Sequence, residues 1–292
     1  MTAHATLVPD RHVLEVAGED RATFLQGLVT NDAEGLCEGE VRFAGLLSPQ
    51  GKILFDFFIV SAGETFLIDC SSAISADLAK RLTLYRLRAK VTIANVSEHW
   101  RVGAAWGDGA AEWAKANAAL AYPDPRFPLL GLRVLFRESD APQLSASPGD
   151  YDAMRIGLAI PEGGKDYAYG DAFPHEACFD LLHGVNFKKG CYVGQEVVSR
   201  MQHRGTARTR VLAVSAKQPL PQGGVDIMAG GFPLGRLGSA AGHHGIALAR
   251  LDRVKEALAK GQTLMAGDVP VTLAAPAWAS YSLDPEPAGA AH

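Results

Sequence analysis

The alternation of apolar and polar residues predicts strands and helices mixed along the first part of the chain. Residues 12–18 alternate like a short strand, and residues 21–28 follow with helical spacing behind Asp20, a candidate cap. Two strand-like segments, 40–48 and 51–60, flank a Pro-Gln-Gly turn. Apolar-rich runs on both sides of such a turn are typical of a β-hairpin. We therefore expect a sheet built around this hairpin.

The same pattern continues to about residue 140. Strands are expected at 65–70, 90–96, 100–107 and 131–136, and helices at 71–88 and 110–120. Hairpins combined with helices predict an α+β domain with a mostly antiparallel sheet. Residues 141–150 have the composition of a linker.

After about Arg208 the pattern changes. Glycines cluster, the strand-like runs are short, and residues 251–261 alone look helical. Short strands with frequent glycine turns predict a small β-barrel. The tail from Asp284 is rich in Pro, Gly and Ala, and we expect it to be flexible.

The composition limits the cellular compartments and the classes of binding partner that we expect. The chain has 292 residues, 48% of them hydrophobic and 21% charged, which fits a globular protein of two or three domains. A net charge of −4 argues against a generally basic nucleic-acid binder. No apolar run is long enough for a membrane helix, and the N-terminus lacks a signal-peptide pattern. These features predict a cytoplasmic protein with reduced thiols and no membrane partner.

The net charge conceals a basic stretch at residues 186–210, which holds six Lys and Arg residues and one acid. Cys191 lies in it beside two lysines, between two glycines, just before a predicted helix at 194–201. A positive helix end and nearby ammonium groups both favour a thiolate. The alternative is a small buried side chain beside solvated lysines, and the glycines and the charge favour the functional interpretation. Glu196 and Arg200 have the spacing of an ion pair on one helix face.

A second basic cluster surrounds Tyr85. Its members are Lys80, Arg81, Arg86, Arg88 and Lys90. If the two clusters converge, they form an anion site suited to a carboxylate tail, a phosphate chain or an RNA backbone. Taken alone, each is more commonly a solvated helix face.

Asp56 stands in a strand whose two faces are otherwise apolar. A buried carboxylate needs a partner or a shifted pKa, so Asp56 is a candidate to bind an aminopyrimidine ring or to act as a general base. An edge-strand Asp open to solvent is equally compatible with the pattern. There is no Cys-x-x-Cys pair, and the adjacent His243 and His244 are weak evidence for a ligand pair, so no permanently bound metal is expected.

Several motifs together resemble one protein family. FKKGCYVGQEVVSR (187–200) resembles the signature of the YgfZ-type folate-binding proteins. These are relatives of the glycine-cleavage T-protein, an aminomethyltransferase, and they assist iron–sulfur cluster assembly. FLQGLVTND (24–32), SPQGKILFDFFIV (48–60) and YRLRAKVTI (85–93) resemble further motifs of the family. The resemblance runs from about Val13 to Leu273.

The resemblance implies an α+β fold of three domains in a T-protein-like ring. Residues 1–45 plus 146–207 would form a folate-binding-type α+β domain carrying the KGCYVGQE motif. Residues 46–145 would form a ferredoxin-like domain, 208–283 a β-barrel and 284–292 a flexible tail. A tetrahydrofolate or a derivative of it would occupy the central opening.

The resemblance also implies a function. The protein would be a tetrahydrofolate-binding accessory factor in the maturation of [4Fe–4S] proteins, supporting tRNA-modifying enzymes, with assembly proteins or client enzymes as partners. Cys191 would supply the reactive thiolate and can transiently ligate iron, and Asp56 would be the second catalytic group. The side chains expected around the folate are Asp56, Asn31, Tyr85, Arg86, Arg88, Lys189, Gln195, Glu196 and Arg200.

Two departures separate the chain from the aminomethyltransferases. Those enzymes carry paired acids in the hairpin strand, where this chain has Phe55 and Asp56, and they have an Arg-x-Glu-x-Gly segment, where residues 155–158 lack the Glu. A pterin-binding carboxylate would then come from Glu162 or Asp56. This favours cluster assembly over a folate-dependent one-carbon transferase with Asp56 as its acid–base group. The net charge and the lack of an aromatic RNA-binding signature argue against an RNA-binding module.

Overall fold

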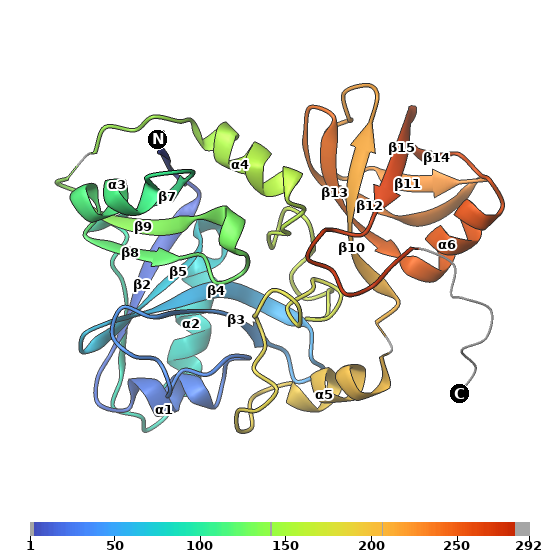
Figure 1. Ribbon diagram of the computed structural model, residues 1–292. Coiled ribbons are helices and arrows are strands. Elements are labelled where there is room, and N and C mark those ends of the chain that lie inside the picture. The colour runs from blue at the N-terminus through green and yellow to red at the C-terminus, as the bar shows by residue number, and fades with distance from the viewer. Residues whose placement is uncertain (1–2, 141, 206, 284–292) are drawn as a thin grey trace. The chain divides into compact units, whose positions relative to one another are not determined.

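The computed structural model describes residues 3–140, 142–205 and 207–283. These residues divide into two compact units (Figure 1). The first unit is made of residues up to 151 together with 182–200, and the second unit is made of 152–181 together with the residues from 201 onward. No helix in the described part of the chain combines the length and the apolar character that crossing a bilayer requires.

The elements follow the chain in a mixed order. The strands are β1 (His4–Leu7), β2 (Arg11–Ala17), β3 (Val41–Leu47), β4 (Ile53–Ala62), β5 (Thr65–Ser71), β6 (Thr92–Asn95), β7 (Trp100–Trp106), β8 (Leu120–Pro123), β9 (Leu132–Arg137), β10 (Thr209–Ala216), β11 (Asp226–Ala229), β12 (Phe232–Ala241), β13 (His244–Arg250), β14 (Leu264–Ala266) and β15 (Val269–Ala274). The helices are α1 (Arg21–Gln26), α2 (Ser72–Arg86), α3 (Ala110–Asn117), η1 (Pro128–Leu130), α4 (Pro148–Gly157), α5 (Gln195–Arg204) and α6 (Leu251–Ala259).

The first unit contains a five-stranded antiparallel sheet in the order β3-β4-β5-β2-β6. The predicted hairpin is present, and its turn is closed by the Ser48 amide donating to the Lys52 carbonyl (2.8 Å). Alternate side chains of the sheet, such as Phe57 and Ile68, pack with Leu78 and Leu82 of α2 in one buried core. Successive residues of a strand point to opposite faces. Asp56 therefore lies on the face turned away from α2.

A second sheet of the first unit has the order β1-β7-β9-β8. The predicted helix at 110–120 is shorter than expected, because α3 ends at Asn117 and Ala118 is already extended. The residues that follow form β8, in which Leu120 pairs with Leu135 and Tyr122 is buried. Strand pairing and the burial of Tyr122 outweigh the helix propensity of the alanines.

In the second unit, six strands close into a barrel in the order β10-β13-β12-β11-β14-β15. Its interior is apolar, with Leu212, Ile227 and Leu237 fully buried. Gly235 permits close pairing, since a Cβ there would lie 2.3 Å from the Leu248 carbonyl oxygen. Two sheets with helices followed by a closed barrel confirm the predicted α+β fold class and the predicted barrel.

The predicted linker at 141–150 overlaps the start of a helix, and one predicted domain limit falls within a strand. α4 begins at Pro148, inside the segment expected to be a linker, and β3 crosses the predicted limit after residue 45. Residues 152–181 group with the barrel in the second unit, whereas 182–200 belong to the first. The division into domains stays a prediction, and the expected flexible tail at 284–292 lies outside the described residues.

Candidate functional site around Cys191

Cys191 lies in an exposed loop of the first unit, just before α5. A turn separates it from the helix, and the Gln195 amide donates to the Tyr192 carbonyl at 3.2 Å. Val198 of α5 is fully buried, which anchors the helix, while the side of α5 bearing Glu196 and Arg200 is open to solvent. The thiol is therefore open to solvent, and the C-terminal end of its loop is held in place by α5.

Lys189 fixes the other side of the loop. Its ammonium donates to three backbone carbonyls, those of Gln26 (2.7 Å), Val29 (2.7 Å) and Asn31 (2.9 Å). Burial lowers the pKa of Lys189 to about 8, against the opposing effect of nearby acids. The three carbonyls accept all three hydrogens of the charged form. Lys189 therefore joins the loop of Cys191 to the N-terminal motif at residues 24–32.

Thr30 and Asn31 strengthen the same junction. The Thr30 hydroxyl donates to the Gly184 carbonyl (2.6 Å), and the Asn186 amide donates to the Thr30 carbonyl (2.9 Å). The Asn31 side-chain amide donates to the carbonyls of Phe43 (2.8 Å) and His183 (2.7 Å). Both side chains are buried, so these bonds replace water that the groups would otherwise bind.

Two glycines bring the hairpin against the same segment. Gly194 has φ +81°, and a Cβ there would lie 2.6 Å from the Ser48 carbonyl oxygen. Gly51 also has φ +81°, and a Cβ there would lie 2.9 Å from Val197. A side chain at either position would be strained and would clash. The N-terminal motif, the hairpin and the Cys191 loop, which are far apart in sequence, therefore meet in one place.

The four cysteines differ in access. Cys191 and Cys37 are exposed, whereas Cys70 and Cys178 are fully buried. Burial raises the pKa of Cys70 to about 12, which keeps that thiol protonated. Access to solvent separates Cys191 from the two buried thiols, and its connection to the N-terminal motif through Lys189 separates it from Cys37.

The structure brings some of the predicted site residues together. Asn31, Lys189 and Gln195 border the Cys191 loop, and Asp56 pairs through the backbone with Gly45, whose amide binds the Thr30 hydroxyl (2.8 Å). Asp56 is 5% exposed. It is thus a buried carboxylate on a central strand rather than an edge residue at a solvent gap, since β3 and β5 flank β4.

Other predicted residues lie elsewhere. Tyr85 and Arg86 belong to the last turn of α2, and Arg88 follows it, so they lie beyond the sheet face opposite Asp56. Arg200 and Glu196 form an exposed ion pair at 2.5 Å, with the Glu196 side chain 86% exposed. The set expected around one folate is therefore divided between two faces of the sheet and a solvent-exposed side of α5.

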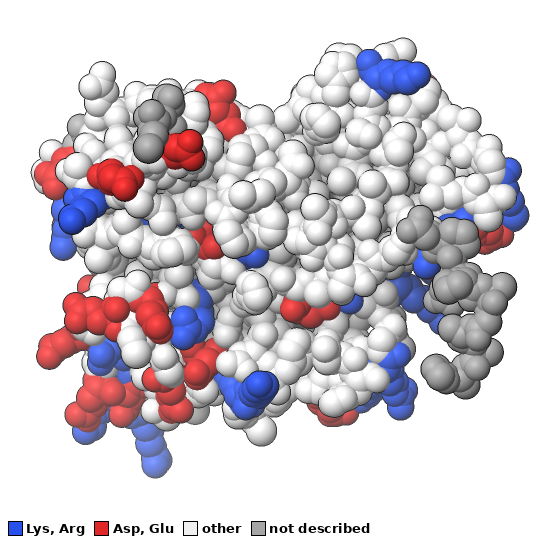
Figure 2. All heavy atoms as spheres, in the orientation of Figure 1, with Lys and Arg blue, Asp and Glu red and all other residues white. Residues whose placement is uncertain are grey.

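The basic stretch at 186–210 is not one continuous basic field. Within the first unit, Lys189 is bound to carbonyls and Arg200 is paired with Glu196. Within the second unit, Arg210 is paired with Asp180 at 2.8 Å. On the face drawn in Figure 2, acidic and basic side chains of the first unit are intermixed. Two of the six basic side chains of this stretch, Arg200 and Arg210, are therefore paired with carboxylates.

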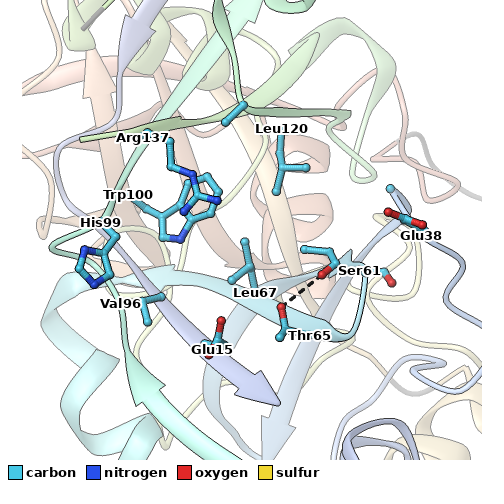
Figure 3. A pocket seen from close by; sticks show the side chains of 14 residues that line it. Glu15, Glu38, Ser61, Thr65, Leu67, Val96, His99, Trp100, Leu120 and Arg137 are labelled. Atoms are coloured by element: carbon cyan, nitrogen blue, oxygen red, sulfur yellow. Dashed lines mark hydrogen bonds between the residues drawn. The ribbon is translucent and has the colours of Figure 1, made fainter. Parts of the chain in front are cut away.

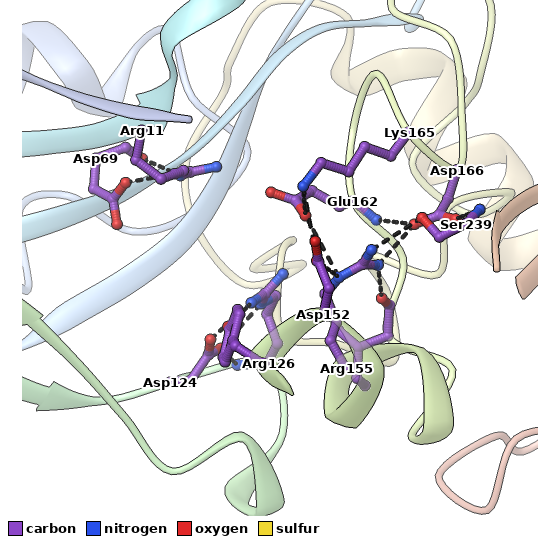
Figure 4. A network of polar contacts seen from close by, with 12 residues as sticks. Arg11, Asp69, Asp124, Arg126, Asp152, Arg155, Glu162, Lys165, Asp166 and Ser239 are labelled. Atoms are coloured by element: carbon purple, nitrogen blue, oxygen red, sulfur yellow. Dashed lines mark hydrogen bonds and ion pairs between the residues drawn. The ribbon is translucent and has the colours of Figure 1, made fainter. Parts of the chain in front are cut away.

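A buried ion network in the first unit was missed by sequence reasoning (Figure 4). Asp69 accepts hydrogen bonds from Arg11 (2.7 Å) and Arg133 (2.8 Å), and Arg126 pairs with Asp124 (2.7 Å). Burial by itself would raise the pKa of Asp69, but the two guanidinium groups hold that pKa below its ordinary value. The guanidinium of Arg133 also lies 4.4 Å from the centre of the Phe58 ring. A charged residue in each of several strands was the available signal.

A second network lies in the second unit and is also drawn in Figure 4. Arg155, whose side chain is 1% exposed, donates to Asp166 (2.8 Å), to the Ile160 carbonyl (2.7 Å) and to Ser239 of the barrel (2.9 Å). Glu162 lies 3.5 Å from Arg155 and 3.1 Å from Lys165. Glu162, a candidate pterin-binding carboxylate, is thus already surrounded by cations.

Comparison with known proteins gives two matching families. The GCVT N-terminal domain matches residues 10–134, and the CAF17 C-terminal β-barrel domain matches residues 208–281. The glycine cleavage system aminomethyltransferase T of Bartonella henselae has a similar structure, with a TM-score of 0.73 over 95% of this chain and 86% of that chain. The two sequences are 13% identical, so this likeness shows the fold.

Relatives in sequence are iron–sulfur cluster assembly factors. The mitochondrial factor IBA57 of Homo sapiens is 33% identical over 84% of this chain and 77% of its own length. That of Mus musculus is 32% identical over 92% of this chain and 83% of its own length. The homolog of Neurospora crassa is 33% identical over 73% of this chain, which spans about half of that protein (53%). The finer assignment to the YgfZ type stays a prediction.

The predicted cytoplasmic location was wrong in the light of these relatives. All three are named as mitochondrial proteins. The prediction rested on patterns that the first residues lack, and such a lack does not specify a compartment. The extent of the human and mouse matches, over both chains, places this protein in the family of the IBA57 iron–sulfur cluster assembly factors.

Proposed function

We propose that this assembly factor works through the Cys191 thiol in the maturation of [4Fe–4S] proteins, including tRNA-modifying enzymes, and that it binds tetrahydrofolate or a derivative. One observation carries the proposal. Cys191 is exposed on a loop that the Lys189 ammonium ties to the N-terminal motif through three carbonyls. A fixed, accessible thiol is suited to transient contact with iron or sulfur held by a partner.

The thiol acts with a partner rather than alone. Iron–sulfur clusters are held mostly by four cysteine thiolates, and Cys191 supplies one. The described residues contain no group of three or more His, Cys, Asp or Glu side chains arranged to hold a metal ion. We therefore treat the cluster as cargo, with the remaining ligands supplied by an assembly protein or a client enzyme.

The folate part of the proposal rests on Asp56. A buried carboxylate can bind the amino and ring N–H groups of a pterin. Arg86 and Arg88 are left out of this site, because α2 packs on the sheet face turned away from Asp56. Folate bound here would leave its glutamate tail to other groups. The folate supplies one-carbon chemistry when it is bound, and Asp56 would orient it.

The role of Cys191 is tested by complementation of cells that lack their own factor, with the activity of a [4Fe–4S] enzyme as readout. We expect Cys191→Ser to lose most of the activity while its circular dichroism and unfolding midpoint stay unchanged. Cys37→Ser is the matched control, since Cys37 is the other exposed thiol among the described cysteines. Full activity of Cys191→Ser would refute the proposed role.

The folate proposal is tested separately by titration with tetrahydrofolate under anaerobic conditions, followed by calorimetry. We expect binding that Asp56→Asn weakens at least about tenfold, a loss of about 1.4 kcal/mol. Unchanged binding in Asp56→Asn would contradict the assignment of Asp56. Formation of methylene-tetrahydrofolate from an amine donor, abolished in Asp56→Asn, would instead support the one-carbon transferase.

A further inference from the structure

A cavity of about 510 Å³ opens between the two sheets of the first unit, and Cys191 is not among the residues that line it (Figure 3). Glu15 and Leu67 line it from the five-stranded sheet, and Trp100, Leu120 and Arg137 line it from the four-stranded sheet or its connections. Glu15 pairs with Leu67 across β2 and β5, so both side chains leave the sheet on the same face. The volume falls in the range of small-molecule sites, roughly 300–1,000 Å³.

One wall of the cavity presents a cation held by an aromatic ring. The Arg137 guanidinium lies 3.9 Å from the centre of the Trp100 ring, and Trp100 is 8% exposed. Stacking on a buried indole restricts the guanidinium and leaves its edge N–H groups directed outward. Arg137 forms no ion pair with any described residue, so its hydrogen-bonding capacity is available for a carboxylate.

Other walls present anions. Glu15 and Glu38 line the cavity, and neither forms an ion pair within the described part of the chain. Figure 3 shows Leu67 between the Trp100–Arg137 stack and Glu15. Leu120 and Val96 add apolar surface. Arg137 and Glu15 lie on opposite sides of Leu67, and Glu38 lies apart from both of them (Figure 3). This arrangement of a cation, an anion and an aliphatic side chain between them is not required by the core of the protein.

We propose that this cavity binds a short apolar peptide by its two charged ends. The terminal carboxylate would bind Arg137, the terminal ammonium would bind Glu15, and the apolar side chains would lie on Leu67, Val96 and Leu120. The site shares no residue with the surroundings of Cys191, so it goes beyond the proposed function.

The test is titration of the full-length protein with the dipeptide leucyl-leucine, followed by calorimetry and by the fluorescence of Trp100. We expect binding in the range of about 0.1–1 mM, weakened roughly tenfold by N-acetylation of the peptide and by amidation of its carboxylate. Trp100→Phe should abolish most of the fluorescence change. Glu112→Gln, on the exposed surface of α3, is the control and should bind like the unmodified protein.

Paired variants assign each end of the peptide. In Glu15→Gln, N-acetylation should cost no further affinity, and in Arg137→Gln, amidation should cost none, because the group that reads each charge is gone. The exposure of Arg137 and the location of Glu15 beside a cavity allow both variants to fold. Absence of binding up to 10 mM, or equal binding of the free and blocked peptides, would overturn the proposal.

Discussion

The arginines inside the first unit and the basic residues at the end of α2 differ in burial and in pairing. Arg126 and Arg133 stand alone in the sequence, yet both are buried and paired with carboxylates. Arg86 and Arg88 stand in a dense basic cluster, yet both are exposed. The contrast shows that basic density along the chain does not indicate where the fold uses a cation.

The reason is the cost of removing charge from water. A buried guanidinium costs several kcal/mol unless a carboxylate lies within hydrogen-bond reach. Arg133 of β9 reaches Asp69 of β5, which is 64 residues away in the chain, whereas Arg126 pairs with Asp124, two residues before it. A run of like charges on one helix has no such supply of partners and remains in solvent.

The largest expected effect is in the buried network. Asp69→Asn leaves Arg11 and Arg133 without their charged partner, and we expect the free energy of unfolding to fall by about 3–5 kcal/mol in denaturant titrations at pH 7. Asp108→Asn, in an exposed turn, is the control and should change stability little. Equal unfolding free energies of the two variants would contradict the conclusion that the buried ion pairs stabilise the fold more than exposed charges do.

The pH dependence sharpens the same test. The pKa of Asp69 is lowered in the folded protein, so its contribution is complete above the unfolded-state pKa of about 3.9 and is lost as pH falls through the folded-state value. We expect unfolding free energy to fall more steeply below pH 4 in the unmodified protein than in Asp69→Asn. Parallel curves in acid would contradict the pairing.

The features that could be predicted from the sequence are those that neighbouring residues determine. The hairpin was predicted from alternation on both sides of residues 49–51, and the glycines and lysines around Cys191 singled out that thiol, whose exposure only the structure shows. The face of β4 that carries Asp56 could not be related to α2, because that relation depends on strand pairings between distant segments. The Arg133–Asp69 pair and the Arg155–Ser239 bond likewise span 64 and 84 residues.

The second largest effect is expected where the hairpin meets the Cys191 segment. Gly194→Ala places a Cβ at φ +81° and 2.6 Å from the Ser48 carbonyl oxygen, and we expect a loss of about 2–4 kcal/mol in unfolding free energy. Gly190→Ala is the matched control, since no atom lies within 4 Å of its added Cβ. If both variants unfold alike, the hairpin does not depend on this close approach.

A smaller effect is expected from Lys189, which unlike the α2 cations is bound by neutral carbonyls. Lys189→Met keeps the length of the side chain but removes three hydrogen bonds, and we expect a loss of about 1–3 kcal/mol. Hydrogen exchange should accelerate at residues 186–194 more than in the rest of the first unit. The exposed neighbour Lys188, changed to Met, should leave that exchange unaltered.

The smallest effect is expected for the Glu196–Arg200 pair on α5. The two side chains are 86% and 55% exposed, so solvent and salt screen the pair even though its atoms lie 2.5 Å apart. We expect Arg200→Met to change the unfolding free energy by less than about 0.5 kcal/mol and the change to vanish at 1 M salt. Loss of iron–sulfur enzyme activity with unchanged stability would show that Arg200 contacts a partner beside Cys191. If Arg200→Met lowers both the enzyme activity and the unfolding free energy, Arg200 has a structural role. That result would contradict the conclusion that cations in a dense basic cluster contribute little to stability.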